Sequence, residues 1–256
     1  MELTDEQWDA IQPHFPDREF ASPGPQGGRP FQDARSIVNA VLWILRTGAP
    51  WADLPRRYPP YQTCHRRFQA WSKDGVLKRI LFALAEDLRG RGKLDLTEAF
   101  IDGTHAGAKR GVLSLASLAV ARRPRSWQWQ TATVSVACGI AGGQRNEVRL
   151  VHETLAERFL DELPERLIGD RAYDSESLDR ELEAEGVDMI APNQRTRAIQ
   201  SQDLRKLRRY RRRWLVERLF AWLLRRRRLV TRYEVHAKNF LGFLQLACAE
   251  LLWRRS

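Results

Sequence analysis

The chain has 256 residues, of which 43% are apolar; this is enough to bury one large or two smaller cores and excludes a disordered tail. Its 43 Lys and Arg residues outnumber 32 acidic residues and give a net charge of +11, which favours a polyanionic partner such as nucleic acid or an anionic membrane. There is no signal-peptide pattern and no apolar run of about 18 residues, so we expect a cytoplasmic protein without a membrane span.

The three cysteines lie far apart along the chain, at positions 64, 138 and 248. Their number is odd and they lack the close pairing that zinc knuckles or disulfide frameworks need, so we expect buried thiols. A metal ion in this protein would therefore need oxygen ligands.

The start of the chain is expected to be helical apart from one loop. Thr4 and Gln7 form a capping-box pattern, which predicts a short helix. Residues 16–30 are rich in Pro and Gly and are expected to form a loop. Apolar residues then recur at helical spacing over 38–45, and Gly48 is expected to end that helix.

A third helix is expected over residues 64–71, with Thr63 as its cap. Its large apolar residues share one face, which leaves His65, Arg66 and Arg67 free to point elsewhere. We interpret this segment as a recognition helix whose polar side chains contact DNA. An ordinary amphipathic surface helix fits the same pattern, and both interpretations stay open.

A further helix over 76–88 completes an all-helical module, and the basic run 89–93 resembles a linker. The expected domains are therefore a helical DNA-binding module over 1–93 and a second domain over 94–256.

Beyond the linker, strands alternate with helices, which is typical of an α/β domain. The apolar stretch 99–101 runs straight into Asp102 and a Gly-Thr turn, and the stretch 166–169 runs likewise into Asp170. A short strand over 187–191 follows. Two acidic residues are thus expected at the ends of two separate strands.

From Leu204 onward the chain is helical and strongly basic, with Glu217 among its arginines. Mg²⁺ prefers carboxylate oxygens together with water and phosphate oxygens, so Asp102, Asp170 and Glu217 form a candidate oxygen-only metal site. Two ions held there would stabilise the attacking and leaving oxygens of phosphoryl transfer. We expect the three carboxyl groups to converge within about 10 Å of one another.

Each carboxylate also has an ordinary structural explanation. An Asp before Gly-Thr is typically a turn residue, and Asp170 has the same alternative. Glu217 would pair with Arg213 or Arg218, as glutamates in basic helices usually do. The combination of all three in one chain favours the metal site.

Three motifs occur in one order: Ile-Asp-Gly-Thr at 101–104, Gly-Asp-Arg-Ala-Tyr-Asp-Ser at 169–175, and Tyr210-x-x-Arg213-x-x-x-Glu217. This order resembles the DDE transposases of bacterial insertion sequences with a Tyr-Arg-Glu signature, and the stretch 43–51 resembles the small helical domain that begins proteins of this group. The resemblance implies an α/β protein with a ribonuclease-H-like mixed-sheet catalytic domain and basic C-terminal helices. It further implies a catalytic triad made by the three carboxylates, Mg²⁺ or Mn²⁺ as cofactor, and cleavage and joining of DNA.

The resemblance also implies which residues meet DNA. Tyr210 and Arg213 would contact or orient a DNA phosphate, and their spacing places them on one helical face with the catalytic glutamate. Arg212 and Arg218 are expected to add phosphate contacts, so DNA binding should weaken strongly with salt. A homodimer on DNA is implied because two element ends must meet. Family members often carry Lys or Gln seven positions after the glutamate, where this chain has Leu224.

Two other functions share part of this pattern. A non-catalytic, sequence-specific DNA-binding protein would use the same basic helices, and a metal-dependent nuclease that cuts without joining would use the same carboxylates. A Cys-His or Ser-His hydrolase fits poorly, because neither His105 nor His152 has a nucleophile in a strained strand-to-helix turn.

Residues 111–145 depart from the pattern of their neighbours. A ribonuclease-H-like core needs antiparallel strands between its first and second aspartates, yet 122–130 is a poor internal strand. Trp is encoded by TGG and Gln by CAA or CAG. If each codon starts at the last base of the preceding one, Trp-Gln-Trp-Gln at 127–130 becomes Leu/Met/Val-Ala-Met/Val-Ala, an apolar run typical of a strand. We therefore predict that this segment is frameshifted or degenerate and that this copy is weakly active or inactive; a divergent insertion with a Trp-rich DNA contact is the alternative.

Overall fold

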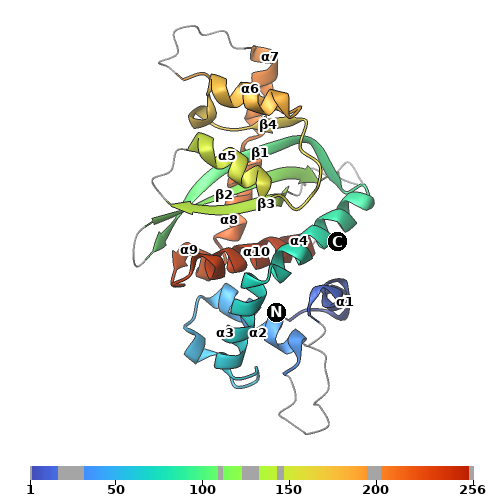
Figure 1. Cartoon of the computed structure of the whole chain (residues 1–256), viewed down its shortest axis with the longest axis vertical. Coiled ribbons are helices and arrows are strands. Elements are labelled where there is room, and N and C mark those ends of the chain that lie inside the picture. Colours follow the sequence, from blue (N-terminus) through green and yellow to red (C-terminus); the bar gives the residue numbers. More distant parts are fainter. Residues whose placement is uncertain are drawn as a thin grey trace. The chain divides into compact units, whose positions relative to one another are not determined.

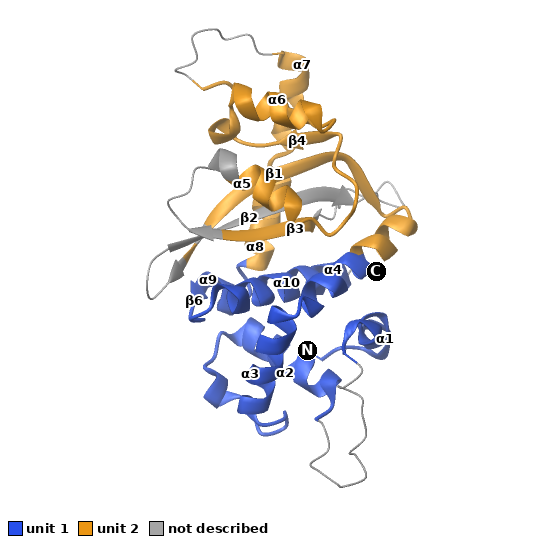
Figure 2. Ribbon diagram, in the orientation of Figure 1, with its two compact units in different colours: residues 1–84, 224–255 blue, residues 85–223, 256 orange. Residues whose placement is uncertain are grey.

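The computed structural model describes residues 2–16, 32–108, 112–122, 133–142, 147–194 and 203–253. It divides into two compact units (Figure 2). Unit 1 comprises Met1–Leu84 and Leu224–Arg255, and unit 2 comprises Ala85–Leu223 with Ser256. The chain thus leaves unit 1 for unit 2 inside a helix and returns to unit 1 near its end. The division into DNA-binding and catalytic domains at residue 93 stays a prediction.

Unit 1 is built mainly from helices, from both ends of the chain (Figure 1). Its elements are α1 (Asp5–Ile11), η1 (Gln12–His14), α2 (Ala34–Thr47), η3 (Trp51–Asp53), α3 (Tyr61–Lys73), most of α4 (Val76–Gly90), α9 (Arg227–Val230), β6 (Thr231–Arg232) and α10 (Ala237–Trp253). Helix α10 packs against α2, α3 and α9. The rings of Phe68 and Phe243, on α3 and α10, lie 4.4 Å apart between centroids, so the last helix completes the core begun by the first ones.

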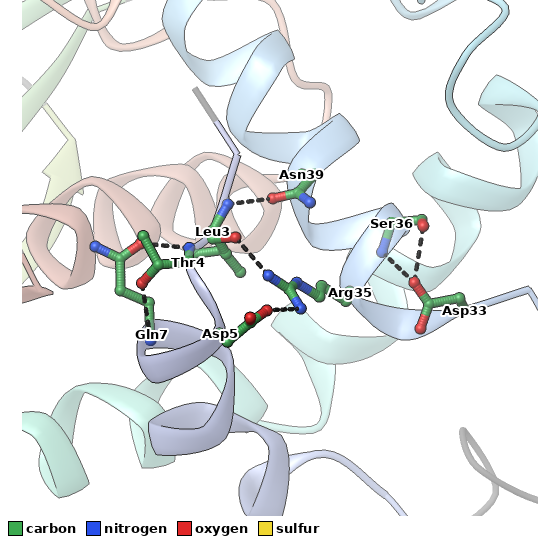
Figure 3. A network of polar contacts seen from close by, with 8 residues as sticks. All are labelled: Leu3, Thr4, Asp5, Gln7, Asp33, Arg35, Ser36 and Asn39. Atoms are coloured by element: carbon green, nitrogen blue, oxygen red, sulfur yellow. Dashed lines mark hydrogen bonds and ion pairs between the residues drawn. The ribbon is translucent and has the colours of Figure 1, made fainter.

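The start of the chain is hydrogen-bonded to α2 (Figure 3). The capping box is confirmed: Thr4 Oγ1 accepts from the amide of Gln7, and Gln7 Oε1 accepts from the amide of Thr4. Arg35 donates to the carbonyl of Leu3, and the amide of Leu3 donates to the buried side chain of Asn39. The capping box satisfies N–H groups that a helix start otherwise leaves without partners, and the bonds of Leu3 hold the preceding residue against α2.

The predicted cap of α3 is wrong. The helix begins at Tyr61, so Thr63 lies within it and Pro60 takes the N-cap position without a side-chain hydrogen bond. The amide of Thr63 donates to the carbonyl of Pro60 at 2.9 Å, which already closes the first turn. Proline is tolerated there because the first helical turn does not need its missing N–H.

The predicted linker over residues 89–93 is partly wrong as well. Helix α4 continues to Gly90, and Gly92, with φ of +63°, forms the turn into the first strand. The C-terminus of α2 is as predicted: Gly48 adopts φ of +70°, a left-handed conformation that glycine accepts without strain.

Unit 2 contains a mixed sheet with helices packed on it. Its strands are β1 (Leu94–Ala108), β2 (Val112–Arg122), β3 (Thr133–Gly142), β4 (Arg166–Ile168) and β5 (Asp188–Ile190). They lie in the order β3-β2-β1-β4-β5; the pairs β1–β2 and β2–β3 are antiparallel, and the pairs β1–β4 and β4–β5 are parallel. This confirms the α/β class, with antiparallel strands between the two aspartates as expected.

The helical elements of unit 2 follow or connect these strands. They are α5 (Glu147–Ala156), η4 (Arg171–Tyr173), α6 (Glu176–Ala184), α7 (Leu204–Leu207), η5 (Arg208–Arg212) and α8 (Trp214–Leu223). Helix α5 packs on β2 and β3, and α8 packs on β1, β2 and β3. In Figure 1, α5 crosses the near face of the sheet.

The segment predicted to be frameshifted contributes two strands to this sheet. Strand β2 pairs with β1, and β3 pairs with β2. Residues 123–132, which include the Trp-Gln-Trp-Gln run, lie outside the described residues. The frameshift itself stays a prediction. Within the described part of the chain, no helix has the length and apolar character that a membrane span requires.

Candidate active site

The register of the sheet brings Asp102 and Asp170 together. Phe100 on β1 pairs with Ile168 on β4 in parallel register. Each aspartate follows two positions later on its own strand or just beyond it, and residues two apart point to the same side of a sheet. Two acidic residues that are far apart in sequence are therefore placed side by side.

The predicted end of the first strand is wrong. Strand β1 continues through Asp102 to Ala108, so Asp102 lies inside the strand and no turn follows it. The strand continues because β2 pairs antiparallel with it; Asp102 pairs with Ser117, and Gly103 with Ala116. The Asp-Gly-Thr pattern at 102–104 follows the end of the pairing between β1 and β4, whereas β1 itself continues to Ala108.

Arg213 joins the two aspartates. Its Nη2 lies 2.8 Å from Asp102 Oδ2 and 3.8 Å from Asp170 Oδ2. Its Nη1 lies 3.4 Å from the hydroxyl of Tyr210 in the preceding η5 turn. The spacing of Tyr210 and Arg213 thus brings them into contact, although a 3-10 turn replaces the continuous helix that the sequence predicts.

Each aspartate is held by the backbone on its other oxygen. Asp102 Oδ1 accepts from the amide of Gly103, and Asp170 Oδ1 accepts from the amide of Ala172, both at 2.9 Å. The Oδ2 atoms remain directed toward Arg213. Charge-assisted bonds to backbone amides fix the orientation of a carboxylate, so both Oδ2 atoms converge on one cation.

The pKa values of Asp102 and Arg213 depend on their partial burial and on each other's charge. The side chains of Asp102, Asp170 and Arg213 are 16%, 32% and 20% exposed. Burial raises the pKa of Asp102, the charge of Arg213 opposes that rise, and the like charge of Asp170 adds to it. Burial acts to lower the pKa of Arg213, but Tyr210 and the two aspartates outweigh it and the pKa is raised.

Glu217, the third predicted carboxylate, is exposed in the first half of α8, four residues after Arg213. Residues four apart lie on one helical face, so Glu217 follows Arg213 along the helix. Within the described residues, no three His, Cys, Asp or Glu side chains are grouped so that they could hold a metal. The structure therefore brings two of the three carboxylates together, and convergence of all three stays a prediction.

Glu98 is a further residue of this region that the sequence did not point to. Its carboxylate accepts from Arg209 at 2.8 Å and forms an ion pair with Arg212. The two arginines lie in η5, so this contact holds the segment before α8 against β1. Arg212 is thus engaged with Glu98 in the free protein, and its contact with DNA stays a prediction. No local pattern signals the pairing, because its members are far apart in sequence.

The loop after β4 is held by a second contact that the sequence did not reveal. The amide of Gln194 donates to Asp174 Oδ2 at 2.6 Å, and the side-chain amide of Gln194 donates to the carbonyl of Arg171 at 3.2 Å. These bonds join the chain after β5 to the loop that carries Asp170.

The predicted DNA contacts on α3 differ in exposure. Arg66 is exposed, whereas His65 and Arg67 are half-buried. The ring of His65 lies 4.8 Å from that of Trp51, and burial lowers the pKa of His65. His65 thus has a packing role in unit 1. All three DNA contacts stay predictions.

A buried ion pair lies near His65. Arg228 donates to Glu234 at 2.6 Å, and their side chains are 6% and 3% exposed. Arg228 also donates to the carbonyl of Ala49, in the turn after α2. The basic C-terminal segment thus supplies at least one arginine to the core of unit 1 rather than to the surface.

The cysteine prediction is confirmed: Cys64, Cys138 and Cys248 are free and buried. Burial raises the pKa of the Cys64 thiol to about 11. A thiol of this kind is not a nucleophile at neutral pH.

Two family models match the chain. A model described as “Putative transposase of IS4/5 family (DUF4096)” matches residues 3–81, and one described as “Transposase DDE domain” matches residues 130–252. The second match includes Asp170 and Glu217, and Asp102 lies between the two matches.

Curated relatives are similar to parts of the chain. A Sinorhizobium fredii protein, “Uncharacterized protein y4sN”, is 33% identical over 49% of this chain and 91% of its own length. The “Insertion element IS402 uncharacterized 16.2 kDa protein” of Burkholderia cepacia is 30% identical over 43% of this chain and 78% of its own length. The “Putative transposase for insertion sequence element IS402”, also of Burkholderia cepacia, is 37% identical over 35% of this chain and 39% of its own length.

Among solved structures, similarity was found to a chain in a cryo-EM structure of the simian T-cell lymphotropic virus intasome in complex with PP2A regulatory subunit B56 gamma. The TM-score is 0.37 at 13% identity, and the match covers 60% of this chain and 48% of that one.

The transposase models and the insertion-element relatives agree with the three sequence motifs and with the mixed sheet that places Asp102 beside Asp170. DDE transposases generally use a divalent metal ion and act on DNA. This chain belongs to the DDE transposases of bacterial insertion sequences.

Proposed function

We propose that this chain cuts DNA at the ends of an insertion sequence and joins those ends to target DNA in the bacterial cytoplasm, with Asp102, Asp170 and Glu217 as its catalytic carboxylates. The observation that carries the proposal is the position of Arg213 Nη2, which lies within 4 Å of an oxygen of both Asp102 and Asp170. Asp102 on β1 and Asp170 just beyond the adjacent parallel strand β4 are thus both oriented toward one cation.

The donor set fits Mg²⁺ or Mn²⁺. Both ions prefer carboxylate oxygens and keep open positions for water and phosphate oxygens. Asp102 and Asp170 would hold the ion through their Oδ2 atoms, and Glu217 would complete the set. A bound divalent ion would activate the attacking oxygen and stabilise the leaving one.

Neighbouring groups of the chain orient the two aspartates for this reaction. The amides of Gly103 and Ala172 orient the two aspartates. Arg213 forms ion pairs with both in the free protein, and on binding DNA its guanidinium would turn to a phosphate, the group for which its planar donors are suited. Tyr210 would orient that guanidinium.

DNA binding would use basic side chains of both units. We infer contacts from Arg212 and Arg218 around α8 and from His65, Arg66 and Arg67 on α3. Two element ends would be brought together by a homodimer. The net charge of +11 supports a polyanionic substrate.

The test is cleavage and strand transfer by the whole chain on DNA that carries the element's terminal inverted repeats, with and without Mg²⁺. Asp102→Asn, Asp170→Asn and Glu217→Gln are each expected to lower both reactions at least about 100-fold, because each removes a metal ligand. Asp188→Asn is the matched control, since Asp188 pairs with Lys206 outside this site.

The possible outcomes separate the three functions. Cleavage without joining to a second DNA would identify a nuclease. Metal-independent DNA binding with no cleavage, unchanged by any of the three substitutions, would identify a non-catalytic DNA-binding protein. Either result contradicts the proposal.

A further inference from the structure

The η5 turn is attached to β1 at two places. Glu98 accepts a hydrogen bond from Arg209 Nε at 2.8 Å and forms an ion pair with Arg212. Four residues further along the same strand, Asp102 pairs with Arg213, the residue that directly follows η5. The two attachments therefore lie at the two ends of the segment that leads into α8.

These polar contacts matter because η5 adds no side chain to the hydrophobic core. The structure describes all five residues of η5, and none of them is buried. Helix α8, which follows at once, packs on β1, β2 and β3 and has a buried apolar face. Burial of apolar surface thus positions α8, whereas charge-assisted hydrogen bonds position η5.

Strand β1 is irregular where it carries Glu98. The register shifts between Asp95 and Ala99, whose partners on β2 are adjacent residues, so residues 96–98 form a bulge. Inside the bulge, Asp95 Oδ1 accepts from the amide and the hydroxyl of Thr97 at 3.0 and 2.7 Å. Bulges redirect side chains and are frequent next to active sites. This bulge ends in a Glu98 side chain that is only 12% exposed, which is unlike an ordinary surface ion pair.

The two arginines use different oxygens of Glu98. Arg209 Nε lies on Oε1, and Arg212 Nη2 lies on Oε2. Arg212 could therefore leave for a DNA phosphate while the bond of Arg209 stays in place. The proposed function also moves Arg213 from Asp102 to a phosphate. Of these attachments, the bond between Glu98 and Arg209 is then the one that persists when DNA binds.

We propose that Glu98 is a positioning residue, which acts through Arg209 to keep η5 on β1 while DNA is bound. The η5 turn leads directly into α8, so this contact also sets the start of the helix that carries Glu217. A displacement of about 1 Å at a reacting site can cost roughly 100-fold in rate. The inference rests on the proposed function only in taking DNA as the ligand of Arg212 and Arg213.

The first test follows η5 without catalysis. Hydrogen–deuterium exchange at millisecond times is measured in residues 208–213 of the whole chain, free and bound to a duplex with the terminal inverted repeat. We expect Glu98→Gln to raise exchange about two- to five-fold, the factor that loss of a partly exposed ion pair gives, and to leave residues 215–223 unchanged. Arg209→Gln should do the same. The increase should be larger with DNA, because Arg213 has then left Asp102.

The second test measures the consequence for the reaction. Glu98→Gln should lower kcat for strand transfer by about 10- to 100-fold without raising KM for DNA, because the released arginines still bind phosphate. A loss of folded protein would instead lower the melting temperature and the amount of DNA bound. Glu98→Asp keeps the charge and should recover part of the rate. Combining Glu98→Gln with Arg209→Gln should cost no more than either change alone, since the two side chains form one contact.

Glu162→Gln is the matched control, because it removes a glutamate that pairs with an arginine, Arg89, elsewhere in unit 2. It should change neither the exchange of residues 208–213 nor the rate. Unchanged exchange of these residues in Glu98→Gln, free and with DNA, would overturn the proposal, as would an equal increase throughout α8. If the unaltered chain binds DNA but neither cuts nor joins it, the proposed function fails, whereas the exchange measurement still decides whether Glu98 holds η5.

Discussion

Arg213 and a divalent ion would compete for the same oxygens of Asp102 and Asp170. We expect Arg213→Ala to lower the stability of the metal-free protein by about 1–3 kcal/mol, because it leaves the partly buried Asp102 carboxylate without its ion-pair partner. Mg²⁺ should then raise the melting temperature of Arg213→Ala more than that of the unaltered chain, since an ion that binds the folded state more tightly stabilises it more.

Thermal unfolding with and without Mg²⁺ measures this difference. Arg211→Ala is the matched control, because Arg211 is an exposed arginine of the same segment. An equal Mg²⁺-induced shift in Arg213→Ala and in the unaltered chain would show that the guanidinium does not occupy the ion's place.

Contacts between side chains that are far apart in the chain were the hardest feature to predict from the sequence. The sequence motifs pointed to four residues that the structure brings into one cluster: Asp102, Asp170, Tyr210 and Arg213. The motifs did not reveal that Arg213 pairs with the aspartates, nor that Glu98 holds the segment before α8. Such pairs depend on tertiary contacts between distant parts of the chain, which leave no periodic signal in the sequence.

Two helix ends were predicted correctly from local signals. Capping at Thr4 and the left-handed Gly48 were predicted because each depends on neighbouring residues alone. The end of β1 was mispredicted because the strand is prolonged by pairing with β2, which an Asp-Gly-Thr pattern cannot signal. The start of α3 was mispredicted because Thr63 is a good cap in isolation, while Pro60 already sets the first turn.

The packing of α10 on α3 depends on a close approach at Gly242. A Cβ atom at this position would lie 3.1 Å from Phe68 Cζ and would collide with the hydroxyl of Ser72. We expect Gly242→Ala to destabilise the protein by about 1–3 kcal/mol, because overpacking outweighs the roughly 1 kcal/mol that alanine contributes to helix propensity. Urea unfolding measures the change.

A second substitution at the same contact provides the control. Within the described structure, Ser72 Oγ is buried and makes no hydrogen bond. Ser72→Ala alone should therefore be neutral or slightly stabilising, and combined with Gly242→Ala it should recover part of the loss. A double variant no more stable than Gly242→Ala would mean that the hydroxyl is not the obstacle.

At the scale of the whole molecule, unit 1 contains both ends of the chain. The sequence suggested a boundary near residue 93 because the composition changes there, but residues 224–255 cluster with the helical start. The hydrogen bond from Arg228 to the carbonyl of Ala49 and the contact of Phe68 with Phe243 join this segment to the helical start. Helix α8, which carries Glu217, is thus followed immediately in the chain by a segment of the other unit.

Residues 111–145 include the strands β2 and β3. Asp102 lies on β1 at its pairing with β2, and β2 pairs in turn with β3, so these two strands support the strand that positions the first carboxylate. If those strands were rewritten by a frameshift, the carboxylates would persist on a poorly packed sheet. A displacement of about 1 Å can cost roughly 100-fold in rate.

We therefore expect that re-encoding residues 111–145 in the alternate frame raises the melting temperature and increases strand transfer by up to about 100-fold, the size of effect that restored positioning produces. The matched control is a gene with synonymous codons over the same stretch, which leaves the protein unchanged and tests for effects of expression. Because Asp102, Asp170 and Glu217 are the same in both proteins, a gain in rate would come from the sheet and not from the ligands. Equal rates and equal melting temperatures in the two proteins would identify the segment as a divergent but functional insertion.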